Sequence, residues 1–302
     1  MGISIDSTII INSLITSLLR GGFYSLMAMG LSLVFGVMNI ANFAHGEMYM
    51  LGAYFSYIFF SNFGLHPLVA IVLAAVAVFI VGIILERTLF YPLRIRSKKN
   101  WLMNTFLLTL GVSIILQNVV RMVMGSKYFG ITNYWKGSVP FAGMNIPYDR
   151  IVGFAIALFA IIGLMLFLNK TRLGCAIRAV SQDPTGAELV GIDLATIHVF
   201  TFGLSCALAA LAGGALLAIA PANPYVGIAP LNKSWFVLIL VGIGNVGGSI
   251  VGGLIVGVLE TIAVMYFGAS WMDVISLCVI ILILLLKPNG LFGKKGVKSA
   301  VE

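Results

Sequence analysis

Long apolar segments, each almost free of charged residues, restrict the folds open to this chain. They cover residues 8–36, 42–60, 67–90, 101–124, 150–169, 198–220 and 272–287. A helix rises 1.5 Å per residue, so about 20 apolar residues cross the roughly 30 Å hydrocarbon core of a bilayer. These segments therefore predict transmembrane helices.

A further apolar stretch, 233–267, is too long for one crossing. Its glycines at 242, 244, 247 and 248 predict that the chain turns back on itself there, which gives two spans. The sequence thus predicts an all-α, polytopic helical bundle of about nine spans, with eight or ten as alternatives.

Composition excludes a water-soluble fold. Hydrophobic residues make up 60% of the 302 positions and charged residues 9%, whereas soluble domains carry roughly 25% charged residues. No linker or charge block separates a soluble module, so we expect one transmembrane domain over residues 1–302. The three cysteines have no metal-ligand spacing, and we expect small buried hydrophobic side chains. They are Cys175, Cys206 and Cys278.

The net charge of +8 reflects basic residues gathered in a few loops, and no aromatic-interleaved basic face indicates nucleic acid. Lys and Arg concentrate in cytoplasmic loops, so an odd span count places the N-terminus outside and the C-terminus in the cytoplasm. A break at Arg20-Gly21-Gly22 would invert the N-terminus alone. The basic loops hold Arg94, Arg96, Lys98, Lys99, Lys170, Arg172, Arg178, Lys287, Lys294, Lys295 and Lys298, and the poorer loops hold Lys127, Lys136, Arg150 and Lys233.

The most polar stretch between two apolar segments is 39–47. It contains Asn39, Asn42, His45 and Glu47. Ionisable groups at membrane depth are functional candidates, and an ordinary polar turn in contact with water is the alternative. A zinc site is not expected, because one His and one Glu fall short of three or four ligands.

Polar residues also occur inside predicted spans. Glu260 needs a donor or a watery cavity there. We expect it to hydrogen-bond between helices, with substrate contact as the alternative, and the same holds for Gln117 and Asn118. Arg121 is expected to extend to the membrane interface.

Small residues recur at helical spacing in the second half. Three G-x-x-x-G pairs join glycines 244 and 248, 248 and 252, and 253 and 257, and Ala210 with Gly214 forms a weaker pair. Such spacing lets helix backbones approach closely in lipid. Packing within the chain is the simpler interpretation, and a face for a second subunit is the alternative.

The loop 170–197 predicts a short cytoplasmic helix at about 184–190. Asp183 is a good N-cap, Pro184 suits the first helical position, and Gly191 favours a left-handed stop. A connector and a docking element are both open on these residues. The phosphate-binding pattern G-x-x-x-x-G-K-[ST] is absent, as are hydrolase motifs, so we expect a protein that is not an enzyme.

Four stretches resemble one family in the right order along the chain. GGFYSLMAMGLSLVFGVMNIANFAHGEMYMLGAY (21–54), RAVSQDPTGAELVGID (178–193), VGIGNVGGSIVGGLIVGVLE (241–260) and KPNGLFGKKG (287–296) are similar to the LivH-type permeases of branched-chain amino-acid ABC importers. The first motif is long and specific, and the glycine-rich one is weak alone.

The resemblance implies an ABC importer permease fold and four kinds of partner. They are a second permease subunit, two ATP-binding cassette subunits, an extracytoplasmic substrate-binding protein and the lipid bilayer. This chain would bind no cofactor, and ATP would be hydrolysed by the partner subunits. The coupling pattern E-A-A-x-x-x-G aligns with Thr185-Gly186-Ala187 and Gly191, so Thr185 replaces the usual Glu. The implied coupling residues are Arg178, Asp183, Pro184, Thr185, Gly186, Ala187, Glu188 and Gly191.

Such a permease would work by alternating access, with a path along 39–47 and 242–257. Permeases for urea, amides or other amino acids are an alternative, and an ATP-independent secondary transporter is another. The latter would show paired broken helices in an internal repeat, but glycine breaks occur mainly in one half. The predicted path residues are Asn39, Asn42, His45, Glu47, Asn245 and Glu260.

Overall fold

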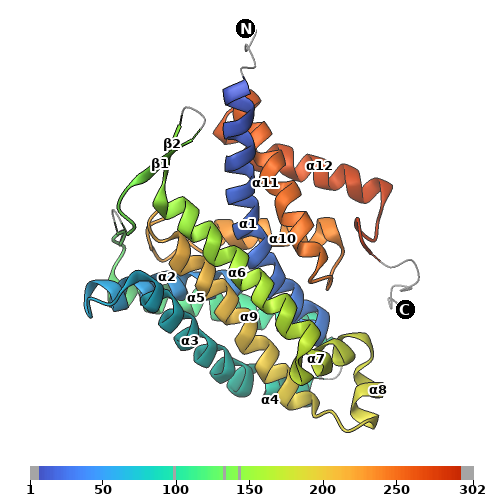
Figure 1. Ribbon diagram of the computed structural model, residues 1–302. Coiled ribbons are helices and arrows are strands. Elements are labelled where there is room, and N and C mark those ends of the chain that lie inside the picture. Colours follow the sequence, from blue (N-terminus) through green and yellow to red (C-terminus); the bar gives the residue numbers. More distant parts are fainter. Residues whose placement is uncertain (1–6, 98–99, 132–133, 142–143, 294–302) are drawn as a thin grey trace.

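The computed structural model describes residues 7–97, 100–131, 134–141 and 144–293, and it is a helical bundle as predicted (Figure 1). A two-stranded antiparallel hairpin, which the sequence did not predict, precedes the sixth helix. The elements are α1 (Ser7–Met38), α2 (His45–Ser61), α3 (Pro67–Leu85), a π-helical turn (Glu86–Phe90), α4 (Tyr91–Arg96), α5 (Trp101–Met124), β1 (Ser138–Phe141), β2 (Met144–Pro147), α6 (Tyr148–Lys170), α7 (Arg172–Gln182), α8 (Pro184–Leu189), α9 (Leu194–Leu216), α10 (Ile228–Val241), α11 (Gly248–Phe267), a 3₁₀ turn (Ala269–Trp271) and α12 (Met272–Leu286).

Seven helices of the described chain are long and apolar enough to cross a membrane. In one of them, α3, the π-helical turn and α4 follow one another without a break from Pro67 to Arg96. This span continues past residue 90, where the sequence predicts its end. Two other helices are shorter, α2 with 17 residues and α10 with 14, and of these α10 is apolar. The seven are Ile11–Met38, Pro67–Arg96, Trp101–Met124, Tyr148–Lys170, Leu194–Leu216, Gly248–Phe267 and Ala269–Leu286.

The two short helices begin next to each other in the interior. The chain leaves α1 at Met38, runs back, and starts α2 at His45, whose Nε2 lies 3.1 Å from the carbonyl oxygen of Met27 in the middle of α1. Gly227, just before α10, lies against Gly46, and a Cβ added at Gly227 would be 1.9 Å from the Gly46 carbonyl oxygen. Each half of the chain therefore contains a short helix that begins in the interior, α2 in the first half and α10 in the second, and we call these two the broken helices. This differs from the expectation that breaks occur mainly in one half.

Helix α1 is continuous through Arg20-Gly21-Gly22, so the suggested break there is wrong. It packs along α11 (Figure 1). The Ser25 hydroxyl donates to the Ile250 carbonyl at 2.9 Å, and Gly257 lies against the backbone of Ser17. The glycine pairs of α11 thus serve packing within the chain, on α1 and on α10. On the other side of the bundle, α9 meets α2 where Gly52 faces Ala210.

The close approach of α1 and α11 gives a first prediction. A Cβ on Gly257 would lie 2.6 Å from the Ser17 carbonyl oxygen, so we expect Gly257→Ala to lower the free energy of unfolding by about 1–3 kcal/mol, as overpacking does. Gly163 in α6 has no atom within 4 Å of such a Cβ, so Gly163→Ala should be neutral or stabilising by up to about 1 kcal/mol. Thermal unfolding of both variants in detergent measures the difference. Equal melting temperatures would contradict this packing.

The predicted turn between α10 and α11 is confirmed at residues 242–247, with Gly242 and Gly244 at φ of 105° and 83°. The turn lies at the end where α1 finishes, because Gly244 packs against Gly36. The segment after α12 returns to the same place. Its Leu291 and Phe292 amides each donate, at 2.9 Å, to the last carbonyls of α10.

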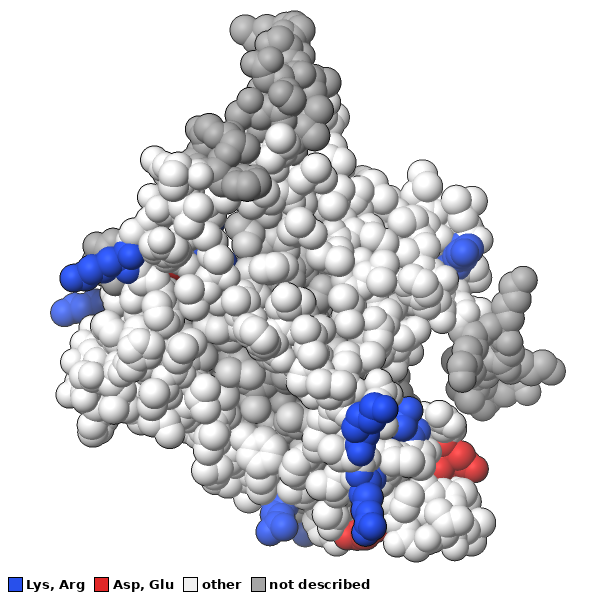
Figure 2. Space-filling view, viewed as in Figure 1, with Lys and Arg blue, Asp and Glu red and all other residues white. Residues whose placement is uncertain are grey.

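The three predicted cytoplasmic stretches all reach this end. The Arg94 guanidinium lies 5.6 Å from the Trp101 ring centroid, and the Trp101 indole donates to the Met38 carbonyl at 3.2 Å. Arg178 and Pro288 line one cavity with the C-terminal part of α1. In Figure 2, Lys and Arg lie around the margin and the broad middle of the face is white, as a lipid-facing band requires. Lys98, Lys99, Lys294, Lys295 and Lys298 lie outside the described residues.

Two further expectations need correction. Most of 170–197 is helical, since α7 precedes the predicted short helix. Cys206 is buried as expected, but Cys175 and Cys278 are exposed. Cys175 lies on α7, an amphipathic helix with one face covered, and Cys278 lies on α12 at the margin of the bundle, where few residues of the chain cover it.

Candidate functional site

The segment joining α1 to α2 is held by its own polar side chains. Asn39 is exposed and has a left-handed φ of 51°. The side-chain Oδ1 of Asn42 accepts from the Ala44 amide at 3.0 Å, while its buried Nδ2 has no partner among the described residues. Ser205 of α9 donates to the Gly30 carbonyl at 2.7 Å. Its hydroxyl lies 3.4 Å from Nδ1 of the fully buried His45. His45 therefore fixes the start of α2 between α1 and α9.

Helix α5 follows this segment with a stripe of polar side chains. The Thr109 hydroxyl accepts from the Phe43 amide at 3.2 Å and lies 3.1 Å from the Ala41 carbonyl oxygen. Of this stripe the sequence predicted a role for Gln117 alone, although the four-residue spacing of its members inside an apolar run marks one helix face. Its members are Thr105, Thr109, Ser113 and Gln117.

The stripe ends at Glu47, in the first turn of α2. Ser113 Oγ and Gln117 Nε2 donate to Glu47 Oε1 at 2.8 and 2.7 Å. Glu47 is 1% exposed, and its Oε2 has no hydrogen-bond partner among the described residues. The interhelical role expected of Gln117 is confirmed. Asn118 instead bonds the Ile114 carbonyl within its own helix.

Aromatic rings join the same segment to α10. Phe43 stacks on Trp235 with ring centroids 5.1 Å apart and meets the edge of Phe106 of α5 at 5.1 Å. Trp235 also contacts Phe35, near the end of α1, at 6.5 Å. Movement of 39–44 would therefore be transmitted to α1, α5 and α10 together.

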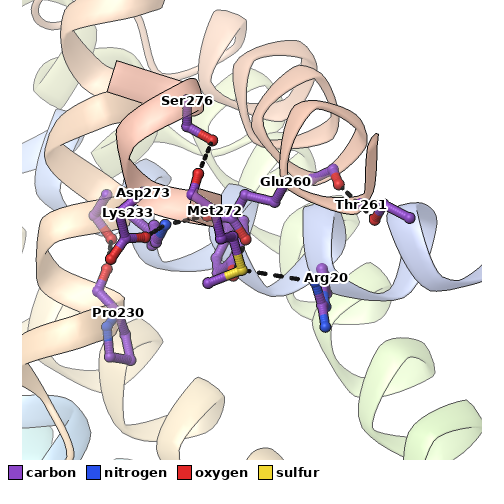
Figure 3. Close-up of polar contacts among 11 residues, drawn as sticks. Arg20, Pro230, Lys233, Glu260, Thr261, Met272, Asp273 and Ser276 are labelled. Carbon is purple, nitrogen blue, oxygen red and sulfur yellow. Dashed lines mark hydrogen bonds and ion pairs between the residues drawn. The ribbon is translucent and has the colours of Figure 1, made fainter. Parts of the chain in front are cut away.

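A buried charge network links α10, α11, α12 and α1 (Figure 3). Lys233 was assigned to a loop, which is wrong. It lies in α10, is 4% exposed, and forms ion pairs with Glu260 and Asp273. Tyr24 of α1 donates to Glu260 Oε2 at 2.7 Å, which confirms the interhelical role expected of Glu260. Glu260 is fully buried, whereas the Asp273 side chain is 67% exposed.

The six predicted path residues do not form one cluster. Asn42, His45 and Glu47 share the start of α2, with Asn39 at the other end of the same segment. Asn245 lies in the α10–α11 turn, where its side chain accepts from the Gly248 amide at 2.8 Å, and Glu260 belongs to the Lys233 network. Among the described residues, no group of three or more His, Cys, Asp or Glu is placed to hold a metal ion.

A cavity of about 870 Å³ opens at the end where α1 finishes. Its walls come from α1, α6, α7, the α10–α11 turn and the segment after α12. The short helix α10 and the long helices α1 and α6 therefore end around one shared space. Polar residues of the lining are Ser32, Asn169, Arg178, Ser181, Gln182, Asn245 and Asn289.

Two helices, α8 and α9, each begin at a capping aspartate at this end. Asp183 accepts from the Thr185 amide at 3.0 Å and begins α8, as predicted, and Gly191 with φ 85° follows its end. Asp193 begins α9. Hydrogen bonds from the Thr196 hydroxyl and the Ala195 amide hold the pKa of the Asp193 carboxyl below its usual value. The two aspartate caps satisfy free backbone amides and so fix the residues at which α8 and α9 begin.

Helix α8 presents two apolar side chains to the outside. Leu189 and Val190 are 84% and 78% exposed, while Ala187 on the opposite face is buried against the bundle. Figure 1 shows α8 projecting from the end of the bundle beside α7. The remaining predicted coupling residues surround this tip: Pro184, Thr185, Gly186 and Glu188 lie on α8, and Arg178 is exposed on α7.

Comparison with known proteins covers nearly the whole chain. Residues 13–284 match the family described as branched-chain amino acid transport system / permease component. The high-affinity branched-chain amino acid transport system permease protein BraD of Pseudomonas aeruginosa is 33% identical over 96% of this chain and 97% of its own. The corresponding LivH protein of Escherichia coli is 31% identical over 92% of this chain and 94% of its own.

A probable LivH protein of Methanocaldococcus jannaschii is 30% identical over 89% of this chain and 88% of its own. No solved structure matches the chain. The family match spans both broken helices and the segment that contains α7 and α8. The chain therefore belongs to the family of branched-chain amino acid transport system permease components.

Proposed function

We propose that this protein is the membrane-spanning permease subunit of an ATP-driven ABC importer for branched-chain amino acids. The observation that carries the proposal is the end-to-end similarity to permeases of high-affinity branched-chain amino acid transport systems. Its partners are a second permease subunit, two ATP-binding cassette subunits and an extracytoplasmic substrate-binding protein. ATP is bound and hydrolysed by the cassette subunits, and this chain binds no cofactor.

The chain forms one permease domain with nine membrane segments, counting α2 and α10 together with the seven long helices. The N-terminus lies outside and the C-terminus lies in the cytoplasm. Support comes from the basic residues Arg94, Arg178 and Lys287, which belong to the three stretches that the positive-inside rule assigns to the cytoplasm. The backbone just before α2 and α10 is irregular. At membrane depth such backbone is tolerated when protein surrounds it.

The translocation path runs along the broken helices, past Asn39, Asn42, His45 and Glu47, toward the cavity beside Asn245. Glu260 contributes by holding α10 against α11 through Lys233. The arrangement favours alternating access, because 39–44 contacts α5 and α10 and ends beside the α1–α9 contact. A bound substrate shifts such an equilibrium only by its different affinity for the two states.

Coupling to ATP runs through residues 172–193. The tip of α8 docks in a groove of a cassette subunit, with Leu189 and Val190 as the apolar contacts. The caps at Asp183 and Asp193 make α8 and α9 stiff enough to transmit its movement. Thr185, in place of the Glu usual in the coupling pattern, leaves the docking to shape and apolar contact.

Transport by the purified complex tests the proposal. Co-expressed with the neighbouring permease, cassette and binding-protein genes of its host and placed in liposomes, the chain should import radiolabelled leucine when ATP and the binding protein are both present. Omission of either should reduce uptake to the level of empty liposomes.

Two outcomes would contradict the proposal. Leucine uptake by this chain alone, without ATP, would indicate a secondary transporter. ATP-driven uptake of urea or short amides, but of no branched-chain amino acid, would place the chain with a different importer.

A further inference from the structure

Glu47 differs from the other buried carboxylates of the described chain. Three Glu side chains are at most 1% exposed: Glu47, Glu86 and Glu260. Glu86 accepts from the Arg94 guanidinium at 2.9 Å, and Glu260 pairs with Lys233. No Lys, Arg or His among the described residues lies within ion-pair distance of Glu47. A carboxylate taken out of water without a cation is costly unless something else compensates it.

Neutral donors compensate Glu47 in part. Oε1 accepts from Ser113 and Gln117, but Oε2 has no partner in the described chain. A proton on Oε2 would not resolve this, because the resulting hydroxyl would lack an acceptor. The position in the first turn of α2 suits a negative charge, since the helix dipole stabilises it there. Half of the carboxylate is thus satisfied by the chain and half is left for another group.

We propose that Glu47 binds the ammonium group of the transported amino acid. The inference rests on the proposed function and names the chemistry of one subsite. An ammonium group carries a positive charge and three hydrogen-bond donors, which supplies the missing cation and a donor for Oε2 together. Glu47 is also well placed for transport. It lies in the first turn of α2, next to the contact between Gly46 and Gly227, the residue just before α10.

Helix α5 covers this subsite. Its hydrogen bonds with α1, α2 and the segment between them run along one line, from Trp101 on Met38 through Thr109 on Ala41 to the two donors on Glu47. Its outer face is apolar and exposed at Ile114 and Ile115. Displacement of this one helix would therefore uncover Glu47, and the ammonium would replace Ser113 and Gln117 as its donor. In the covered state, the chain's own residues keep lipid and a neighbouring subunit away from Glu47.

The test uses the assembled importer with Glu47→Gln. Glutamine keeps an oxygen acceptor for Ser113 and Gln117 but removes the charge. We expect leucine uptake to fall at least about tenfold, because hydrogen bonds to a charged group are the strong ones. The complex should still assemble, and its melting temperature should be unchanged or higher, because an unpaired buried charge is gone.

The matched variant is Ser113→Ala with Gln117→Ala, which keeps the charge and removes its neutral donors. It should lose stability, and its uptake per assembled complex should fall less than that of Glu47→Gln. Glu47→Asp, which shortens the side chain but keeps the charge, should transport better than Glu47→Gln.

Three results would overturn the inference. They are wild-type uptake with Glu47→Gln, failure of that variant to assemble, and a greater loss of uptake in the Ser113 and Gln117 variant than in Glu47→Gln. None of these three results contradicts the proposed function. The proposed function is contradicted by a different result, a wild-type complex that imports no branched-chain amino acid.

Discussion

Replacing Lys233 by methionine should prevent the protein from accumulating as a stable fold. Lys233 is 4% exposed and is the cation for the fully buried Glu260. Removing one partner of a buried ion pair leaves the other charge uncompensated and costs about 3–5 kcal/mol, which is a large part of the stability of a typical protein. Size-exclusion chromatography of the fluorescently tagged chain in mild detergent should show loss of the monodisperse peak.

Second-site changes separate the charge effect from packing. Lys233→Met combined with Glu260→Gln should recover most of the folded protein, because Tyr24 keeps an acceptor and no unpaired buried charge remains. Asp273→Asn should have little effect, since the Asp273 side chain is 67% exposed and water screens its attraction to Lys233. If the double variant is as poorly folded as Lys233→Met alone, charge compensation is not the function of this pair.

Much of the bundle could be predicted from local sequence signals. Apolar length locates the long helices, and the glycines at 242 and 244 mark the turn between α10 and α11 because their φ values are positive. The caps at the starts of α8 and α9 are local too. Asp183 bonds an amide two residues later, so its residue type and position predict the start of α8.

The parts that were missed depend on contacts distant in sequence. The sequence predicts a loop at Lys233, because a lysine is costly inside an apolar helix. Its ion-pair partner Glu260 lies 27 residues later on another helix, so local sequence does not reveal the pair. The start of α10 beside α2 depends on the approach of Gly227 to Gly46. Composition gives no sign of that contact, because each glycine alone is compatible with an ordinary loop.

The candidate site was located in part by the same local logic. The stretch 39–47 stands out as polar between apolar segments, and it proved to be the buried start of a broken helix. Ser113 and Thr109 were not singled out, because hydroxyl side chains in a membrane helix ordinarily bond their own backbone. Their four-residue spacing gains meaning only once α5 is placed against α2.

Replacing Leu189 and Val190 together by aspartate should uncouple transport from ATP. Both side chains project from the tip of α8 and are 84% and 78% exposed. Burying one such side chain at an interface contributes about 1.5–3 kcal/mol, so the pair accounts for about 3–6 kcal/mol, or at least about a hundredfold in affinity. We expect the cassette subunits to be lost from the purified complex and leucine uptake to fall to background.

The fold of the chain should not change in this variant, because neither side chain packs against the bundle. Lys170→Gln is the control, since Lys170 is exposed at the end of α6 and lies outside residues 172–193. That variant should retain the cassette subunits and its uptake. The buried residue of α8 gives the opposite pattern: Ala187→Asp should disturb the chain itself, since Ala187 is 4% exposed. If the Leu189 and Val190 variant still binds the cassette subunits and imports leucine, the docking surface lies elsewhere on α7 and α8, and the exposed tip of α8 is only a connector between α7 and α9.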